Sequence, residues 1–198
     1  MPKESVVFGI AGVFFGILVG WMIGSQQARP PATTITAPAA AAPQAQTAQP
    51  FDQSRASALE ATIARNGSDV ESRVQLGDLY FDAERFADAT KWYEDALRIN
   101  PKHVNASTDL GIAYYYMNQP DRALQQFDRS LAVDPKHTKT LLNVGIVRAF
   151  GKQDLAGATK AWEQVLAIDP NGPEGQAAKR ALDTLKSAHG NTAAKPGA

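Results

Sequence analysis

The residues that could carry chemistry are few and lie far apart. The histidines are His103, His137 and His189, and cysteine is absent, which excludes disulfides and thiolate metal sites. His103 and His137 each follow Pro-Lys and lie 34 residues apart, which the repetition of a turn explains without any chemistry. No third metal donor accompanies them, and no phosphate loop or dinucleotide fingerprint is present. Catalysis needs convergent polar groups, so the sequence predicts a protein that is not an enzyme and uses no cofactor.

Charge gives no global preference for a partner. Lysine and arginine together number 20, as do aspartate and glutamate, so the formal net charge is zero. A neutral chain has no long-range field that would attract nucleic acid or acidic lipid. The functional argument must therefore come from how the residues are arranged along the chain, and nucleic acid is not expected as a partner.

The N-terminal segment is apolar enough to cross a membrane. Residues 6–24 read VVFGIAGVFFGILVGWMIG without a charge. At about 1.5 Å per residue this segment is roughly 28 Å long, close to the thickness of a bilayer core. The competing interpretation is a cleaved signal peptide, whose apolar region runs about 7 to 15 residues before a small-x-small site. This run is longer, and Gln26 occupies a place where a small residue is needed. We therefore favour an uncleaved signal-anchor.

Orientation and helix pairing follow from residues in and around this segment. Lys3 precedes the segment closely, whereas Arg29 lies five residues after it, which favours a cytoplasmic N-terminus with the bulk of the chain outside. A glycine stripe recurs every four residues and would place these glycines on one helix face: Gly12, Gly16, Gly20 and Gly24. Glycine is common in membrane helices, but this register predicts a homodimer through the stripe or docking on a partner helix.

Residues 25–50 change composition abruptly. They contain five prolines and nine alanines, and Arg29 is their only charge. The prolines would interrupt any helix that the alanines favour, so the segment is expected to be a disordered tether.

Beyond residue 50 the sequence repeats with a period of 34 residues. Each unit carries a glycine, then an alanine, an aromatic residue four positions later, and a closing proline. Glycine and alanine are expected where paired helices cross, the aromatic residues fill the space between units, and proline stops each second helix. The glycines are Gly77, Gly111 and Gly145, the alanines Ala89, Ala123 and Ala158, the aromatics Tyr93, Phe127 and Trp162, and the prolines Pro101, Pro135 and Pro170. The last interval is 35, and the extra residue is expected in the turn 151–154.

This pattern resembles the tetratricopeptide repeat, a helix-turn-helix unit with a 34-residue period. The resemblance implies an all-α fold, a right-handed superhelical solenoid, preceded here by a transmembrane helix. Arg73, Ser107 and Leu141 replace the early tryptophan of the signature, and Arg148 replaces its tyrosine. Three units in phase nevertheless make the resemblance specific.

The repeat fixes the expected domain boundaries. Ser68 and Glu71 are expected to form a capping box at the entry of the first unit. A solenoid needs caps at its ends because its terminal units would otherwise expose apolar faces. The expected segments are a flank 1–5, an anchor 6–24, a tether 25–50, a leading half-repeat helix 51–69, repeats 70–103, 104–137 and 138–172, a capping helix 173–187 and a disordered tail 188–198.

The resemblance also implies a concave groove, lined by the first helices, that binds a peptide. Exposed apolar stripes mark binding sites, unless the capping helix folds over part of this one. The first unit is expected to contribute Val74, Asp78, Phe81 and Asp82, the second Thr108, Asp109, Ile112, Tyr115 and Tyr116, and the third Lys139, Leu142, Asn143, Ile146, Ala149 and Phe150.

Some proteins of the resembled family grip chaperone C-terminal carboxylates through lysine, asparagine and arginine. Of the corresponding positions only Lys139 matches, and Asp78 and Asp109 are acidic, so a chaperone tail is not the expected ligand. The expected partner is a protein or peptide with an apolar or aromatic segment and a basic residue that meets Asp78, Asp82 or Asp109.

These features together predict a membrane-anchored scaffold or adaptor of the bacterial type, a single-pass protein of the inner membrane with its repeats in the periplasm. An alternative in the same layout is a chaperone of cytochrome c maturation that holds the unfolded apocytochrome. A subunit of an enzyme complex is a third interpretation, for which no residue speaks.

Overall fold

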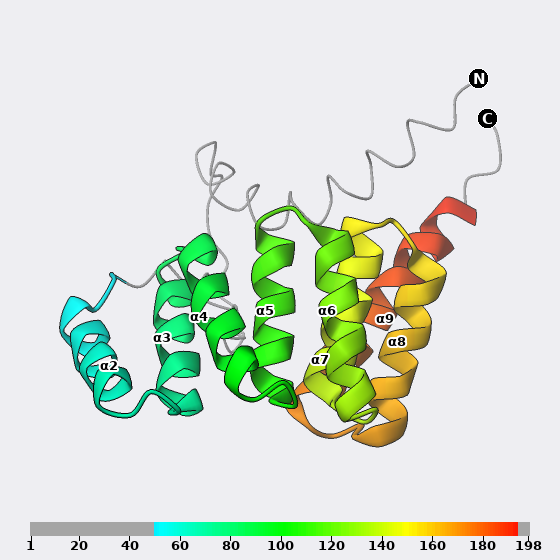
Figure 1. Cartoon of the computed structure of the whole chain (residues 1–198). Coiled ribbons are helices and arrows are strands. Elements are labelled where there is room, and N and C mark those ends of the chain that lie inside the picture. The colour runs from blue at the N-terminus through cyan, green and yellow to red at the C-terminus, as the bar shows by residue number, and fades with distance from the viewer. Residues whose placement is uncertain (1–49, 194–198) are drawn as a thin grey trace, which may run out of the picture. The chain divides into compact units, whose positions relative to one another are not determined.

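The computed structural model describes residues 50–193, which form α-helices and one π-helical turn and no strand. Successive helices pack side by side as antiparallel pairs, and the pairs stack into a solenoid (Figure 1). The elements in chain order are α2 (Gln53–Arg65), α3 (Val70–Asp82), α4 (Phe86–Ile99), α5 (Val104–Tyr116), α6 (Pro120–Val133), α7 (Thr138–Ile146), the π-helical turn η2 (Val147–Gly151), α8 (Leu155–Ile168) and α9 (Pro173–Ala193).

Each repeat is held together by an aromatic ring that lies on a glycine. Tyr93 of α4 packs so closely on Gly77 of α3 that a Cβ atom added to this glycine would lie 2.5 Å from Cε1 of the ring. Phe127 covers Gly111, and Trp162 covers Gly145, in the same way. The three rings are at most 1% exposed. A missing side chain is therefore what lets the paired helices approach, as the repeat pattern predicted.

The turns between the paired helices share one geometry. Glu84, Asn118 and Gln153 have φ of 57°, 57° and 56°, the left-handed conformation that closes a helix. In the first turn the Glu84 amide donates to the Phe81 carbonyl and the Arg85 amide to the Tyr80 carbonyl, which is the pattern of a Schellman motif. Asparagine adopts this left-handed conformation more readily than most residues do. Glutamate and glutamine occupy it here because the hydrogen bonds of the turn hold them in place.

The extra residue of the third repeat lies in a helix and not in the turn. The prediction placed it within residues 151–154, but Gln153 and Ala158 keep the same separation as Asn118 and Ala123. The residue is inserted before the turn, in η2, where the Lys152 amide donates to the Val147 carbonyl across five residues at 3.0 Å. A π-helical turn is the usual way for a helix to absorb one inserted residue.

The N-cap of α3 also differs from the prediction. Asp69, and not Ser68, caps α3, because its Oδ1 accepts from the Ser72 amide at 3.0 Å. Ser68 instead donates to the side chain of Asn66. The equivalent residue of the second repeat, His103, caps α5 through Nδ1, which accepts from the Ala106 amide at 3.1 Å. The Pro-Lys-His turns thus start helices.

The C-terminal helix closes the solenoid and is longer than expected. Ala178 and Leu182 of α9 are buried against Trp162 and Val165 of α8, which shows the cap role of this helix. The helix begins with Pro173 and continues to Ala193, six residues into the segment 188–198 that was predicted to be disordered. No proline occurs in residues 188–193, so every residue there keeps the backbone donor that the helix needs.

The predicted anchor, its glycine stripe and nearly all of the tether, residues 1–49, lie outside the described residues. None of the helices within residues 50–193 is both long and apolar enough to span a membrane.

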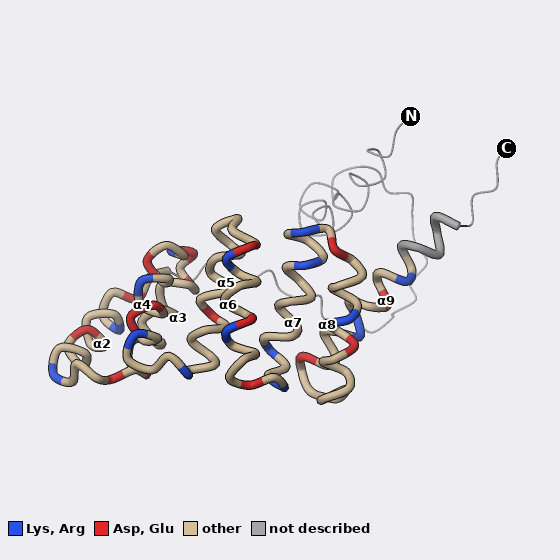
Figure 2. Tube along the Cα trace, turned by 45° about the vertical axis from the view of Figure 1, so that its right-hand side comes forward, with Lys and Arg blue, Asp and Glu red and all other residues tan. Residues whose placement is uncertain are grey.

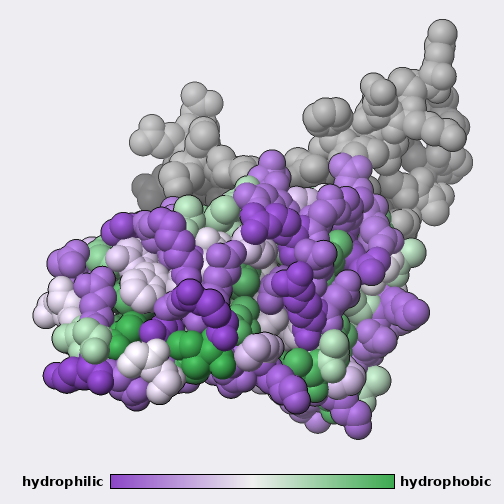
Figure 3. Space-filling model, in the orientation of Figure 1, coloured by the Kyte–Doolittle hydropathy of each residue, from purple (hydrophilic) through white to green (hydrophobic). Residues whose placement is uncertain are grey.

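The surface of the solenoid carries charges of both signs along its whole length (Figure 2). In the view of Figure 3 it is largely hydrophilic, and its hydrophobic side chains gather in small groups near the lower edge. Among the exposed large hydrophobic residues, three occupy one repeat position at the end of a second helix: Ile99, Val133 and Ile168. Their exposed fractions lie between 38% and 42%.

The contact between Phe127 and Gly111 predicts a packing defect on substitution. In Gly111→Ala the new methyl would overlap the buried ring, which cannot leave the core, so overpacking of about 1–3 kcal/mol should exceed the gain in helix propensity of about 1 kcal/mol. We expect a net loss of up to about 2 kcal/mol in the free energy of unfolding, measured by urea denaturation with circular dichroism. Gly67→Ala is the control, because nothing lies within 4 Å of its Cβ position. Equal stability of the two variants would refute the close-contact argument.

Candidate functional site

A pocket of about 420 Å³ lies on the surface formed by the first helices α3, α5 and α7. We call it the first-helix pocket. It combines acidic, aromatic and aliphatic side chains, most of which belong to the predicted groove. The lining residues are Asp78, Phe81, Asp82, Tyr93, Asp109, Ile112 and Lys139. The structure thus brings together groove residues that are up to 61 positions apart in the chain.

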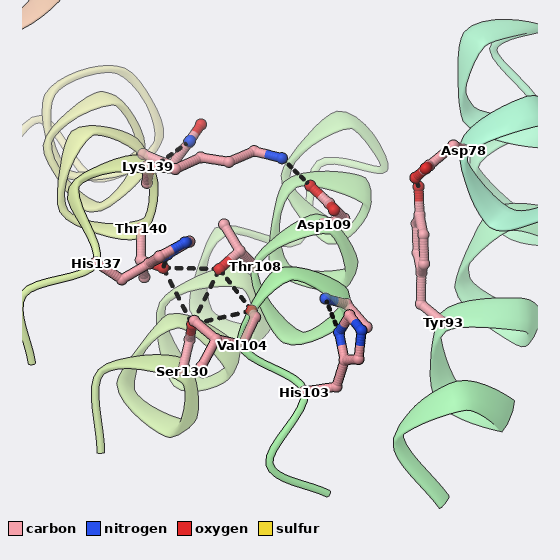
Figure 4. Close-up of polar contacts among 12 residues, drawn as sticks. Asp78, Tyr93, His103, Val104, Thr108, Asp109, Ser130, His137, Lys139 and Thr140 are labelled. Atoms are coloured by element: carbon pink, nitrogen blue, oxygen red, sulfur yellow. Dashed lines mark hydrogen bonds and ion pairs between the residues drawn. The ribbon is translucent and has the colours of Figure 1, made fainter. Parts of the chain in front are cut away.

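Asp78 is the most constrained acid of this pocket. The side chain is half-buried, and its Oδ1 accepts a hydrogen bond from the Tyr93 hydroxyl at 2.8 Å (Figure 4). Burial raises the pKa of the Asp78 carboxyl, the Tyr93 hydrogen bond lowers it in part, and the nearby Asp109 charge adds to the increase. Burial and the Asp78 charge together raise the pKa of Tyr93 far above its usual range, so this hydroxyl always donates. A carboxylate that is costly to ionise is a carboxylate that gains from a bound cation.

Lys139 already has one acidic partner. Its Nζ lies 2.6 Å from Oδ1 of Asp109, an ion pair that joins α7 to α5 across the first-helix surface (Figure 4). Asn143 lies one turn further along α7, where its Nδ2 donates to the Lys139 carbonyl at 2.8 Å. Neither side chain is arranged as a free donor for a ligand carboxylate. With three aspartates against one paired lysine, the pocket is net negative.

An aromatic cluster adjoins the first-helix pocket at the C-terminal ends of α3 and α5. Phe81 meets Tyr116 edge-to-face at 5.4 Å, and Phe86 stacks on Tyr116 at 4.9 Å. Tyr115 packs beside Tyr116 at 6.0 Å. Tyr116 is nevertheless 59% exposed, so a large ring area faces the solvent. Offset and edge-to-face packing fixes these rings in place at little entropic cost for a ligand.

The third repeat contributes less open surface than expected. Leu142 and Ile146 are half-buried and pack against the core cluster that α9 enters through Ala178 and Leu182. Ala149 is 5% exposed and belongs to that cluster. Phe150, in the π-helical turn, is 43% exposed. The capping helix therefore reduces the apolar stripe at this end, and the open part of the groove lies between the first and second repeats.

Two further predicted groove residues, Val74 and Thr108, do not reach the groove. Val74 is 5% exposed and packs inside the core with Ala106 and Leu110 of the next repeat. Thr108 is fully buried, and its Oγ1 lies within 3 Å of the hydroxyls of Ser130 and Thr140 (Figure 4). Both residues lie near the N-terminal ends of their helices, where the neighbouring repeat closes over the stripe.

Sequence reasoning missed two members of the site, Tyr93 and Phe86. Tyr93 was assigned to packing, but its hydroxyl, which neither Phe127 nor Trp162 can match, reaches Asp78. That hydroxyl, at a position where the other repeats have Phe127 and Trp162, was a usable signal. Phe86 begins α4 and enters the aromatic cluster from a second helix, whereas the groove prediction considered only the first helices.

The arrangement of these side chains suits the binding of a ligand. No group of three or more histidine, aspartate or glutamate side chains within the described part of the chain could hold a metal ion. What the site offers is an acidic pocket beside exposed rings. This is a surface suited to a segment that carries a cation and an apolar side chain.

The helix pairs, the ring-on-glycine contacts and the stacked repeats define an all-α repeat protein of the kind that serves protein interaction. Two models described as tetratricopeptide repeat match the sequence, one over residues 69–136 and one over residues 108–173. Together they span more than half of the chain, and the chain belongs to the tetratricopeptide-repeat family. Among curated proteins, none matches the sequence.

Solved structures of this fold resemble the chain. The crystal structure of MamA is 18% identical, with a TM-score of 0.55, and the match covers 67% of this chain and 80% of MamA. The first repeat domain of human RPAP3 is 24% identical, with a TM-score of 0.56 over 62% of this chain and 93% of that domain. The first such domain of Spaghetti (RPAP3) is 22% identical, with a TM-score of 0.50 over 69% and 97%. At these identities the likeness shows the fold alone.

His137 predicts a pH-dependent contribution to stability. Its Nδ1 lies 2.7 Å from the buried Thr140 hydroxyl, and burial lowers the pKa of the imidazole. Since the folded-state pKa lies below the unfolded value of about 6.5, the unfolded chain binds the proton first, and stability falls as the pH drops from about 7 toward the folded pKa.

We expect His137→Asn to flatten this part of the pH profile, because asparagine also caps a helix but does not titrate. The measurement is the urea midpoint at pH 7.5, 6.5 and 5.5, with pH 7.5 as the internal control where residue 137 is neutral in both proteins. A variant as sensitive to pH as the parent would show that His137 contributes nothing.

Proposed function

We propose that this protein is a scaffold or adaptor that binds a partner protein through the first-helix pocket and the aromatic cluster. The observation that carries the proposal is the juxtaposition of Asp78, Asp82 and Asp109 with Phe81 and the 59%-exposed ring of Tyr116. A tyrosine that is fixed by its neighbours yet open to solvent is a typical anchor for a partner side chain.

The chemistry of the pocket supports a partner that carries a cation and an apolar side chain. A lysine or arginine of the ligand would meet the aspartates, and an apolar or aromatic side chain would lie on the rings. The Spaghetti (RPAP3) domain was solved with the HSP90 peptide SRMEEVD. An acidic tail of this kind does not suit the present pocket, because its one lysine, Lys139, is paired with Asp109 and three carboxylates would repel the ligand. The proposed partner segment is therefore positively charged, unlike the acidic HSP90 peptide.

Substitution of the pocket tests this proposal. The double variant Asp82→Asn with Tyr116→Ala removes one exposed acid and one exposed ring, and two such contacts contribute about 1–2 kcal/mol, so capture of the partner should fall roughly fivefold to thirtyfold. Asp128→Asn with Val133→Ala is the matched control, since it removes an exposed acid and an exposed apolar side chain from α6. The measurement is quantitative mass spectrometry after pull-down.

Either of two results would count against this surface: equal capture by both double variants, or loss of capture by the control alone. The identity of the captured proteins also separates the alternatives. A single large complex would favour the scaffold role, whereas peptides with haem-attachment motifs would favour a chaperone of cytochrome c maturation, whose unfolded client the aromatic cluster could hold.

We also propose that residues 6–24 anchor the protein in the bacterial inner membrane, with the repeats in the periplasm. The uncharged run of nineteen residues and the position of Lys3 support this assignment. The stripe of Gly12, Gly16, Gly20 and Gly24 supports pairing of two such helices into a homodimer. The tether of residues 25–50 would then hold the repeats away from the bilayer.

Membrane extraction tests the anchor and the stripe in one experiment. The full chain should leave the membrane only with detergent, whereas a chain that begins at residue 25 should be extracted by salt alone, because it lacks the apolar run. Gly16→Leu with Gly20→Leu should keep the chain in the membrane but abolish its cross-linked dimer, since the larger side chains separate the helices. Salt extraction of the full chain would disprove the anchor, and a persisting dimer would disprove the stripe. A compartment-sensitive reporter at Ala198 reads out the orientation.

A further inference from the structure

A second pocket, of about 500 Å³, lies between the second helices α4 and α6 above α5. We call it the arginine pocket, after the three arginines on its rim. Its residues come from two adjacent repeats and none belongs to the predicted groove. They are Glu94, Leu97, Arg98, Pro101, Ser107, Leu110, Tyr114, Arg122, Gln125, Gln126 and Arg129.

The arginine pocket and the first-helix pocket lie on opposite faces of α5. Leu110 and Tyr114 line the arginine pocket, whereas Asp109 and Ile112 line the first-helix pocket. Successive helix positions are about 100° apart, so these two pairs point in nearly opposite directions. A ligand in one pocket therefore leaves the other open.

The charge of the arginine pocket is positive. Three arginines face one acid, Glu94, which accepts from the Tyr114 hydroxyl at 2.5 Å and lies 3.9 Å from Arg122. Arg98 pairs with Asp95, outside the pocket. Arg129 donates only to the amide oxygen of Gln126, at 3.2 Å, and has no carboxylate partner among the residues of the described solenoid. This side chain has a full charge and several free donors at the rim.

The repeat packing does not require these arginines. The positions equivalent to Arg98 in the neighbouring units hold Ala64 and Ala132. Those equivalent to Arg129 hold Asp95 and Gln164. The same helix-helix junction thus forms three times among the described repeats, and arginines at both of these positions occur only at the central junction. A feature that the fold can omit at equivalent positions is available for a ligand.

The floor of the arginine pocket also selects its ligand, by apolar contact. Leu97, Leu110 and Pro101 give it apolar area, and the buried Gln126 and Ser107 satisfy each other, with Nε2 of Gln126 donating to Oγ of Ser107 at 2.8 Å. A bare inorganic anion would use only the rim. We propose that the arginine pocket binds an acidic segment of a partner protein, in which carboxylates pair with Arg98, Arg122 and Arg129 while an apolar side chain lies on Leu97 and Leu110.

The arginine pocket is a second site beside the first-helix pocket of the proposed function. It selects a negatively charged segment, whereas the first-helix pocket selects a positively charged one. Arginine suits the task because its planar group can bind a carboxylate through two parallel hydrogen bonds. Because Arg98 and Arg122 are 76% and 54% exposed, the ion pairs would be screened, so binding should weaken as the salt concentration rises.

The test uses the full chain and a fluorescent peptide of alternating glutamate and leucine, followed by fluorescence polarisation. The double variant Arg98→Ala with Arg129→Gln installs the residues of the next junction, Ala132 and Gln164, and leaves the contacts of Glu94, Tyr114 and Arg122 intact. Two exposed charge contacts should reduce the affinity about threefold to tenfold. Arg180→Gln is the control, because this arginine is exposed on α9, far along the chain from the pocket, and should leave the affinity unchanged.

Two further probes sharpen the result. The same peptide with glutamine in place of glutamate should bind at least about threefold more weakly, and inorganic phosphate should not displace the acidic peptide at a similar concentration. The proposal is overturned if the parent chain does not bind the acidic peptide, if the double variant binds it as tightly as the parent, or if the glutamine peptide binds equally well. Displacement by phosphate would also overturn the proposal, because the rim would then bind any anion and the apolar floor would not contribute.

Discussion

The ring-on-glycine contact is the constraint on which the rest of the solenoid depends. Tyr93, Phe127 and Trp162 differ in size and polarity, yet each lies on the glycine of its own first helix and each is almost fully buried. A glycine at this point lets the two backbones approach until the ring fills the remaining space. Since the same contact recurs in every repeat, the same helix-pair geometry recurs, and stacking follows from it.

Because this contact fixes the pairs, other positions of the repeat are free to differ. The position of the signature tryptophan holds Arg73 in the first repeat, where its guanidinium donates to Asp95 and to the carbonyls of Asp69 and Gly67. The second repeat has Ser107, which bonds to Gln126, and the third has Leu141 in an apolar cluster. Ionic, polar and apolar contacts thus occupy one site of the frame. Buried polar groups are tolerated there because each one is satisfied.

The sequence was sufficient for the features that recur and insufficient for those that depend on neighbours. The glycines, the alanines and the closing prolines specify the helix pairs, since their physical role is local. The sequence predicted the inserted residue of the third repeat in a turn, because turns usually tolerate insertions better than helices do. The chain instead accommodates it in the π-helical turn η2. Asp69 outcompeted Ser68 as a cap because its carboxylate reaches the Ser72 amide.

The groove was predicted in part for the same reason. A helical stripe gives the correct side for Asp78, Phe81 and Ile112, but it cannot say where the next repeat closes over that side. Thr108 fell on the stripe and is buried by Ser130 and Thr140, which come from two other helices. Phe86 was missed because it enters the aromatic cluster from a second helix. Such contacts depend on the twist between repeats, and no single-helix pattern contains that information.

Net neutrality conceals a segregation of charge that has a physical consequence. The two sides of α5 face pockets of opposite charge. Asp109 lines the negative first-helix pocket, and Arg122 and Arg129 line the positive arginine pocket. At physiological ionic strength the Debye length is about 8 Å, so each charge is felt by a ligand in its own pocket far more than by one on the far side of the helix. A chain without a global field can therefore discriminate ligands by sign at short range. Selectivity of this kind resides in the contact itself and not in long-range attraction, which means that the apolar parts of each site, the exposed ring of Tyr116 and the floor at Leu97 and Leu110, must supply much of the affinity.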